Sequence, residues 1–241
     1  MRGPLSLLPL VLADVVFEVG SRRIVDGVSL TLERGPRTIV LGPNGAGKSV
    51  LLRLCHGLLQ PTSGRIEWNA PELPGAPRRQ AMVFQRPVLL RRSARRNVTY
   101  ALKLAGIHGA DREERATEAL RKVGLDALGD RYARTLSGGE QQRLALARVW
   151  ALSPEVLFLD EPTASLDPGA AHEVENVIAA MHAAGTKIVM VTHNLGQAKR
   201  LGDEILFLHQ GRVVERAPAD RFFKQAASRE AAQFLEGELP W

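Results

Sequence analysis

The sequence predicts an α/β fold built on a mainly parallel sheet. Short apolar runs alternate with helical patterns along most of the chain, an order typical of parallel strands joined by crossover helices. A glycine-rich loop, Gly42–Ser49, lies between one apolar run and one helical pattern. A strand-free block, residues 93–152, interrupts this alternation. We therefore expect an inserted α-helical subdomain within the α/β core.

The first third of the chain supplies short strands and the helix after the glycine loop. Val15–Val19 is β-rich, and an extension precedes it. The apolar run Arg37–Leu41 leads into the loop. Lys48–Gly57 is expected to be a helix that ends near Gly57, with Pro61 beyond its end. Two further strands are expected, at Arg65–Trp68 and Ala81–Phe84.

Helical spacing dominates from Ser93 to Gly124, where Gly106–Ala110 separates two helices. Ser137 is an N-cap residue for a helix that runs to about Leu152. The continuous apolar run Val156–Leu159 then predicts a strand buried on both faces. Further core strands are expected at Lys187–Val191 and Ile205–Leu208, with a helix from Pro168 and a hairpin partner, Arg212–Glu215, after Gly211.

We expect one domain over residues 1–241, because the length is too short for two such domains. Its expected parts are a core of residues 10–86 and 153–216, a helical subdomain of about 87–152 and a C-terminal helical tail of 217–241. The single cysteine, Cys55, lies in an apolar stretch, so we expect a buried side chain and no internal disulfide.

The composition argues against a nucleic-acid partner and against a membrane-spanning segment. The net charge is +6, but only 5% of residues are aromatic and the arginines form no basic strip with stacking aromatics between them. A basic surface that faces ATP and an anionic inner membrane leaflet explains the charge equally well. No stretch approaches the ~20 apolar residues that a spanning helix needs.

The glycine loop has the spacing Gly-x-x-x-x-Gly-Lys-Ser between a strand and a helix, the setting of a phosphate-binding loop. Backbone N–H groups surround the phosphates, and the helix N-terminus adds partial positive charge. We expect Lys48 to reach the β- and γ-phosphates and the Ser49 hydroxyl to bind Mg²⁺. The expected nucleotide-binding residues here are Gly42, Pro43, Asn44, Gly45, Ala46, Gly47, Lys48, Ser49 and Val50.

Two carboxylates follow the buried strand that ends near Leu159. Asp160 stands at the carboxyl end of a parallel strand, where such sheets bind ligands, and suits the Mg²⁺ shell, usually through water. Glu161 is placed to orient and deprotonate an attacking water. An ordinary acidic turn before Pro162 is the alternative, and the glycine loop favours the catalytic interpretation.

A second anion site is expected in LSGGEQQR, Leu136–Arg143, because Ser137, Gly138 and Gly139 precede a helix N-terminus. With both motifs in this order, residues 15–214 resemble ATPase subunits of the ATP-binding cassette (ABC) family. The resemblance implies a cassette of the P-loop NTPase class with an N-terminal antiparallel β part. It also implies a head-to-tail homodimer in which the signature of one chain closes the ATP site of the other.

The resemblance assigns roles to several further positions. Gln85 follows an expected strand as the family's Q-loop glutamine does, and would contact Mg²⁺ or the attacking water. Asp167 belongs to a segment similar to the D-loop, and His193 is similar to the switch histidine that senses the γ-phosphate. The expected catalytic residues are thus Glu161, His193 and Gln85, and the expected metal ligands are Ser49, Gln85 and Asp160.

One departure from the family pattern concerns the adenine base. Many members carry F-x-Y-G near the start, where the tyrosine stacks on adenine, but this chain has Val19 at that position. We expect Phe17 to be a core-facing strand residue, not a replacement. Losing the aromatic face removes stacking worth ~1 kcal/mol, so we expect weak discrimination between ATP and GTP.

Three kinds of ABC protein are considered. Soluble cassettes that act on translation usually carry two cassettes per chain, and the DNA-repair type inserts a long coiled coil for which this spacing leaves no room. The remaining kind is the energising subunit of a transporter with separate transmembrane permease chains. Such a subunit is peripheral, at the cytoplasmic face of the inner membrane.

The direction of transport stays open between import and the export of lipids or drugs. Residues Phe84–Gly106 and Phe234–Trp241 look similar to ATPases of tungstate and related oxyanion importers. That similarity implies import of an oxyanion such as tungstate or molybdate, with a periplasmic or lipoprotein solute-binding protein. A basic cluster follows Gln85 and is either a permease-docking surface or a solvated face: Arg86, Arg91, Arg92, Arg95 and Arg96.

Overall fold

The computed structural model describes residues 6–70 and 79–238. Residues 6–70 and 187–238 form one compact unit, the glycine-loop unit, and residues 79–186 form a second, the helical unit. The chain ends that belong to the expected domain 1–241, including the last residues of the segment Phe234–Trp241, lie outside the described residues. The division into core, helical subdomain and tail stays a prediction.

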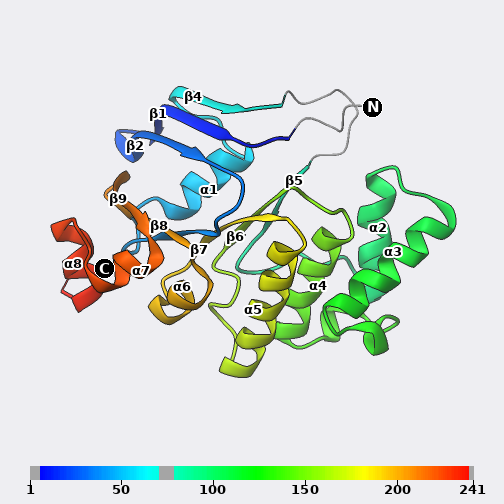
Figure 1. Cartoon of the computed structure of the whole chain (residues 1–241). Coiled ribbons are helices and arrows are strands. Elements are labelled where there is room, and N and C mark those ends of the chain that lie inside the picture. Colours follow the sequence, from blue (N-terminus) through cyan, green and yellow to red (C-terminus); the bar gives the residue numbers. More distant parts are fainter. Residues whose placement is uncertain (1–5, 71–78, 239–241) are drawn as a thin grey trace. The chain divides into compact units, whose positions relative to one another are not determined.

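The glycine-loop unit contains the N-terminal antiparallel sheet that the family resemblance implied. Its strands are β1 (Leu10–Val19), β2 (Arg22–Leu32) and β4 (Ser63–Trp68), in the order β2-β1-β4. In Figure 1 they are the blue and cyan strands. β1 begins at Leu10, not at the expected Val15, because Leu10 and Leu12 are buried and pair with both neighbouring strands. β2 was not predicted.

The parallel strands of this unit are β3 (Thr38–Leu41), β7 (Lys187–Val191) and β8 (Glu204–His209), in the order β7-β3-β8. Every residue of β3 and β7 is buried, which confirms the strands expected from continuous apolar runs. β9 (Arg212–Pro218) pairs antiparallel with β8, as expected for the hairpin.

Four helices belong to the glycine-loop unit: α1 (Lys48–His56), α6 (Leu195–Leu201), α7 (Ala219–Lys224) and α8 (Arg229–Glu236). Gly57 ends α1 in the left-handed conformation, and Cys55 is buried as expected. Phe222 and Phe234 of the last two helices lie 6.0 and 5.1 Å from the Phe207 ring of β8, between ring centroids. The C-terminal helices therefore add aromatic side chains to the core around β8.

The helical unit holds a parallel pair of strands, β5 (Gln80–Val83) and β6 (Val156–Asp160). Its helices are α2 (Ala94–Leu104), α3 (Gly109–Lys122), α4 (Gly138–Trp150) and α5 (Pro168–Ala183). α2, α3 and α4 contact one another, and no strand occurs within residues 93–152, as expected. Among the described residues, no helix is long and apolar enough to cross a membrane.

A buried lysine gives the fold a pH dependence that can be measured. Lys187, at the start of β7, donates to Thr38 Oγ1 (2.9 Å) and to the Pro36 carbonyl. Burial lowers the pKa of Lys187 from 10.5 to about 8, although the nearby carboxylates Glu204, Asp203 and Glu33 oppose the shift and Arg216 adds to it. The unfolded chain therefore binds more protons between these two pH values, so the free energy of unfolding rises with pH in that window.

Urea unfolding at about pH 7.5 and about pH 9.5 checks this prediction. The wild type should gain more unfolding free energy over the interval than Lys187→Met, in which this titration is absent. An equal gain in the two proteins would show that Lys187 does not titrate there.

Candidate functional site

The glycine loop joins β3 to α1, and two of its glycines lie against backbone that leaves no room for a side chain. Gly42 has φ 148°, and a Cβ there would lie 2.0 Å from the Leu208 carbonyl oxygen. Gly47 has φ 98°, and a Cβ there would lie 2.4 Å from the Ile24 carbonyl oxygen. Only glycine allows both the left-handed backbone and this close approach.

The loop and the start of α1 have the charge and donors that suit a phosphate. Lys48 is 6% exposed, and its Nζ donates to the carbonyl oxygens of Gly42 (2.8 Å) and Pro43 (2.9 Å). No side chain caps the N-terminus of α1, and its first turn carries no acidic residue. Helix N–H groups and a neighbouring ammonium together favour an anion. The residues therefore fit the phosphate chain of a nucleotide.

The two carboxylates expected to act in catalysis, Asp160 and Glu161, lie at the carboxyl end of β6 in the helical unit. Asp160 is the last residue of that strand and is 6% exposed. Glu161 is half-buried and has φ 49°, a left-handed conformation that non-glycine residues seldom adopt. Such a backbone costs on the order of 1 kcal/mol and is commonest at functional sites.

Magnesium is the metal that these residues suit. Among the residues the structure describes, no group of three or more His, Cys, Asp or Glu side chains is arranged to hold a metal ion. Ser49 and Asp160 each offer oxygen, the atom that Mg²⁺ prefers, and Mg²⁺ usually takes its remaining ligands from waters and substrate phosphates. The side chains fit an ion that arrives with a nucleotide.

The signature residues begin α4 in a rigid geometry. Ser137 is the N-cap: its hydroxyl accepts from Glu140 N (3.3 Å), and its own N–H donates to Glu140 Oε2 (2.6 Å). The bond from the Ser137 N–H lowers the pKa of Glu140. The S-x-x-E spacing signals such a capping box, a role of Glu140 that the sequence reading missed. Ser137 and Gly138 are exposed, whereas Gly139 is buried and a Cβ there would lie 2.7 Å from Ala170 Cβ.

Gln85 and the signature helix are connected within the helical unit. Gln85 is exposed shortly after β5. The side chain of Gln142 in α4, which is 1% exposed, donates to the Phe84 carbonyl at 3.4 Å. This hydrogen bond connects the backbone next to Gln85 with the helix that the signature residues begin.

The remaining expected residues lie at strand and helix ends. Asp167 is the N-cap of α5 and accepts from Ala170 N (3.0 Å), so it already has a structural role. His193 is exposed after β7 and immediately precedes Asn194, the N-cap of α6. The glycine-loop unit thus carries the loop residues and His193, and the helical unit carries Gln85, Ser137, Gly138, Gly139, Asp160, Glu161 and Asp167.

Phe17 lies in strand β1 as expected and is half-buried, so its side chain is only partly within the core. The pairing of β1 with β2 shifts register on either side of this residue, so simple alternation of inward and outward side chains fails. Val19, at the end of β1, is 61% exposed.

A glycine loop before a helix, and a buried strand that ends in Asp160 and is followed by Glu161, define a nucleotide-hydrolysing protein of the P-loop class. Residues 25–164 match the model of the ABC transporter family, and the chain belongs to that family. It is therefore an ABC ATPase, a subunit that binds and hydrolyses ATP.

Relatives of known role are closely similar in sequence. The tungstate uptake system ATP-binding protein TupC of Peptoclostridium acidaminophilum is 41% identical over 205 residues, which are 85% of this chain and 94% of that protein. The phosphate import ATP-binding protein PstB 2 of Natronomonas pharaonis is 36% identical over 247 residues, covering 95% and 87%.

Solved structures confirm the fold. An ATP-binding subunit of an ABC transporter, 27% identical, superposes with a TM-score of 0.80 and covers 95% of this chain and 100% of its own. The dimeric cassette MJ0796 bound to ADP and Pi, 26% identical, has a TM-score of 0.75 and covers 87% and 98%.

Proposed function

We propose that this chain is the ATP-hydrolysing subunit of an importer for an oxyanion such as tungstate or molybdate. The observation that carries the proposal is the 41% identity to TupC over 85% of the chain. Relatives at 34–36% identity serve phosphate, methionine, glycine betaine and Fe(3+) systems, which favour import over the export of lipids or drugs. The subunit would act at the cytoplasmic face of the inner membrane, with separate permease chains and a solute-binding protein.

In this proposal Lys48 and the N–H groups of the loop hold the β- and γ-phosphates, and Ser49, Asp160 and Gln85 hold the metal. Mg²⁺, when bound, neutralises charge on the phosphate oxygens. Glu161 accepts a proton from the water that attacks the γ-phosphorus, and the bond to the β-phosphate oxygen breaks to release ADP and phosphate. His193 senses the γ-phosphate. Asp167 is one of the residues that bind the nucleotide in the dimer.

The signature residues act on the nucleotide of a second, identical chain. Ser137 and Gly138 are exposed at a helix N-terminus whose backbone the capping box holds in place. Each chain has two anion-binding sites, the glycine loop and the signature, but one ATP has a single γ-phosphate. If two chains associate head-to-tail, each ATP can contact the glycine loop of one chain and the signature of the other. A structural neighbour that is dimeric with ADP and Pi supports the association of two chains.

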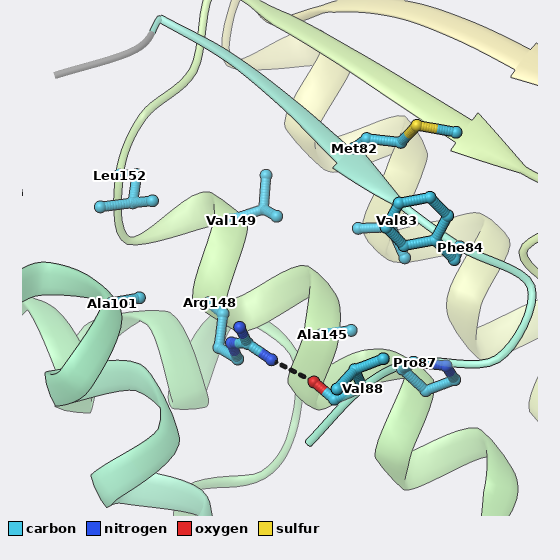
Figure 2. A pocket seen from close by; sticks show the side chains of 10 residues that line it. All are labelled: Met82, Val83, Phe84, Pro87, Val88, Ala101, Ala145, Arg148, Val149 and Leu152. Atoms are coloured by element: carbon cyan, nitrogen blue, oxygen red, sulfur yellow. Dashed lines mark hydrogen bonds between the residues drawn. The ribbon is translucent and has the colours of Figure 1, made fainter. Parts of the chain in front are cut away.

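A pocket in the helical unit is the proposed contact for the permease (Figure 2). Its volume is about 180 Å³. It lies between the end of β5 and helices α2 and α4, and its lining residues are Met82, Val83, Phe84, Pro87, Val88, Ala101, Ala145, Arg148, Val149 and Leu152. The lining is apolar apart from Arg148, whose Nη1 donates to the Val88 carbonyl at 2.6 Å. Burial lowers the pKa of Arg148.

The basic cluster next to this pocket divides by environment. Arg95 donates to Thr117 Oγ1 (2.7 Å), and Arg92 lies over the Tyr100 ring at 5.1 Å, so both stabilise the helical unit itself. Arg92 is nevertheless exposed, as are the other three, Arg86, Arg91 and Arg96. We propose that a cytoplasmic segment of the permease places an apolar side chain in the pocket and acidic side chains against these three arginines.

Replacing Val88 by aspartate should weaken permease binding by about tenfold or more, because a charge would enter the centre of an apolar contact. Val88 is 78% exposed, so the isolated ATPase should fold and hydrolyse ATP as the wild type does. Co-purification with the permease measures the effect. Leu104→Asp is the matched control, an apolar residue of the same unit that is 72% exposed and does not line the pocket. Equal losses in both variants would contradict the assigned surface.

Replacing Val19 by tyrosine should lower the Kd for ATP by about fivefold, the equivalent of one added stacking contact of ~1 kcal/mol. The wild type should bind ATP and GTP with similar Kd values. Competition against a fluorescent nucleotide measures both, and Val214→Tyr, at another exposed valine of the same unit, is the control. A strong preference of the wild type for ATP would show that another group already contacts the base.

Purification of the chain from native membranes in mild detergent tests the proposed function. We expect a multi-span permease and a solute-binding protein to co-purify, and the binding protein to bind tungstate or molybdate in preference to phosphate. A binding protein that takes methionine or Fe³⁺ would overturn the oxyanion assignment. Recovery with ribosomes or DNA would overturn the transport role.

A further inference from the structure

Backbone hydrogen bonds connect the glycine loop to a turn and a strand of its own unit. The Gly211 N–H, in the turn between β8 and β9, donates to the Ala46 carbonyl at 3.0 Å. The Asp26 N–H, in β2, donates in turn to the Gly211 carbonyl at 2.9 Å. A chain of two backbone hydrogen bonds therefore runs from β2 through this turn to the loop.

The three segments are in direct backbone contact, without side chains between them. Gly211 has φ 80°, and a Cβ there would lie 2.8 Å from the Ile24 carbonyl oxygen. The same carbonyl would meet a Cβ on Gly47 at 2.4 Å. A shift of β2 or of the turn therefore reaches the loop directly, because closely packed backbone transmits displacement.

Charged side chains hold the turn against β2. Asp26 accepts from Arg212 Nε (2.8 Å) and from Arg23 Nη1 (3.1 Å), and its Oδ2 lies 2.6 Å from Arg212 Nη2 in an ion pair. Arg23 also donates its Nε to Glu18 of β1 at 2.8 Å. The Asp26 side chain is only 18% exposed, and the Arg212 hydrogen bonds hold its pKa below the usual value. The carboxylate is thus ionised and engaged on both sides at neutral pH.

We propose that Asp26 is a positioning residue for nucleotide binding. Together with Arg212 and Arg23 it holds Gly211 against Ala46, and so keeps the N–H groups of the loop in a geometry that fits the phosphates. The carboxylate acts through the turn. Since β1 pairs with β2 up to Val19 and Arg22, the same contacts connect the strand end expected to lie near the base with the phosphate loop. The inference rests on the proposed assignment of Gly42–Ser49 as the phosphate site.

The test measures the Kd for a non-hydrolysable ATP analogue by calorimetry and the melting temperature without nucleotide. Asp26→Asn and Arg212→Gln should each raise Kd and KM by about tenfold, within the range of coupling between neighbouring residues, and leave kcat at saturating ATP near the wild-type value. Arg23→Gln, which removes the longer contact, should show a smaller increase and serves if the first variants fold poorly.

Asp203→Asn is the matched control. Asp203 accepts from Arg37 Nη2 (2.8 Å) and Nε (3.0 Å) at the start of β3, the end opposite to the glycine loop. It should lower the melting temperature and leave Kd unchanged. If Asp26→Asn also lowered the melting temperature and left Kd unchanged, Asp26 would have only a structural role and the proposal would be overturned.

Lys48→Ala, measured alongside, separates the two levels of inference. Lost binding in Lys48→Ala with an unchanged Kd in Asp26→Asn would overturn the positioning role alone. Wild-type Kd in Lys48→Ala would overturn the phosphate-site assignment and the positioning role with it.

Discussion

Replacing Glu161 by glutamine is expected to lower ATP hydrolysis by about 10²- to 10⁴-fold, the usual contribution of a general base. Glutamine keeps the size of the side chain and its ability to accept a hydrogen bond, but it cannot take a proton from the attacking water. ATP should still bind, because the phosphate contacts come from the glycine loop. The nucleotide would then remain between two chains and hold them together.

Size-exclusion chromatography with ATP and Mg²⁺ measures this state. Glu161→Gln should elute as a dimer and return to a monomer when nucleotide is removed. Glu114→Gln is the control, since Glu114 is an exposed carboxylate on α3 of the same unit. Normal ATP hydrolysis by Glu161→Gln would show that Glu161 is not the general base. A variant that stays strictly monomeric with ATP and Mg²⁺ would contradict the proposed ATP-bound dimer.

The backbone at Glu161 supports a functional role independently of the motif. Its φ of 49° is a conformation that glycine would adopt without strain. Asp14, Ser153 and Gln210 have similar φ values, but Glu161 combines this backbone, which costs on the order of 1 kcal/mol, with a place directly after Asp160, which favours a functional role. The residue follows the buried end of β6, so the strain falls where the chain leaves the sheet.

Elements with strong local signals were predicted well from the sequence. β7 consists of Lys187 and a continuous apolar run of four residues, and its bounds agree with the expected ones. α4 begins after Ser137 as expected, because N-capping is a local interaction. β2 was missed because its polar residues and the Asp26-Gly27 pair interrupt the alternation, and its pairing with β1 comes from the tertiary fold. α6 was missed because seven residues are too few for a helical period to stand out.

The candidate site divides in the same way. The glycine loop and the signature have fixed spacing and are visible in the sequence, whereas the support behind the loop joins Asp26, Ala46 and Gly211, which are far apart along the chain. The basic cluster is also ambiguous in sequence. The contacts of Arg95 with Thr117 and of Arg92 with Tyr100 distinguish these two arginines from Arg86, Arg91 and Arg96.

Replacing Ser137 by arginine should separate ATP binding from ATP hydrolysis. If the signature serves the nucleotide of the other chain, the Kd of an isolated chain for ATP should stay near the wild-type value. Hydrolysis should fall by at least about 100-fold, because the large arginine side chain would keep the phosphate of the other chain's nucleotide away from the N–H groups at the start of α4. In the Glu161→Gln background, the ATP-dependent dimer should be lost.

The structural part of this effect has a matched control. Ser137→Arg also removes a helix N-cap, a loss of about 1 kcal/mol in stability. Ser93 caps α2 of the same unit, and its side chain accepts from Arg96 N at 3.3 Å, the distance found for Ser137 and Glu140 N. Ser93→Arg should therefore lower stability to a similar degree and keep both dimer and turnover. If Ser137→Arg weakens ATP binding to the single chain as Lys48→Ala does, the signature belongs to the ATP site of its own chain and the head-to-tail arrangement is wrong.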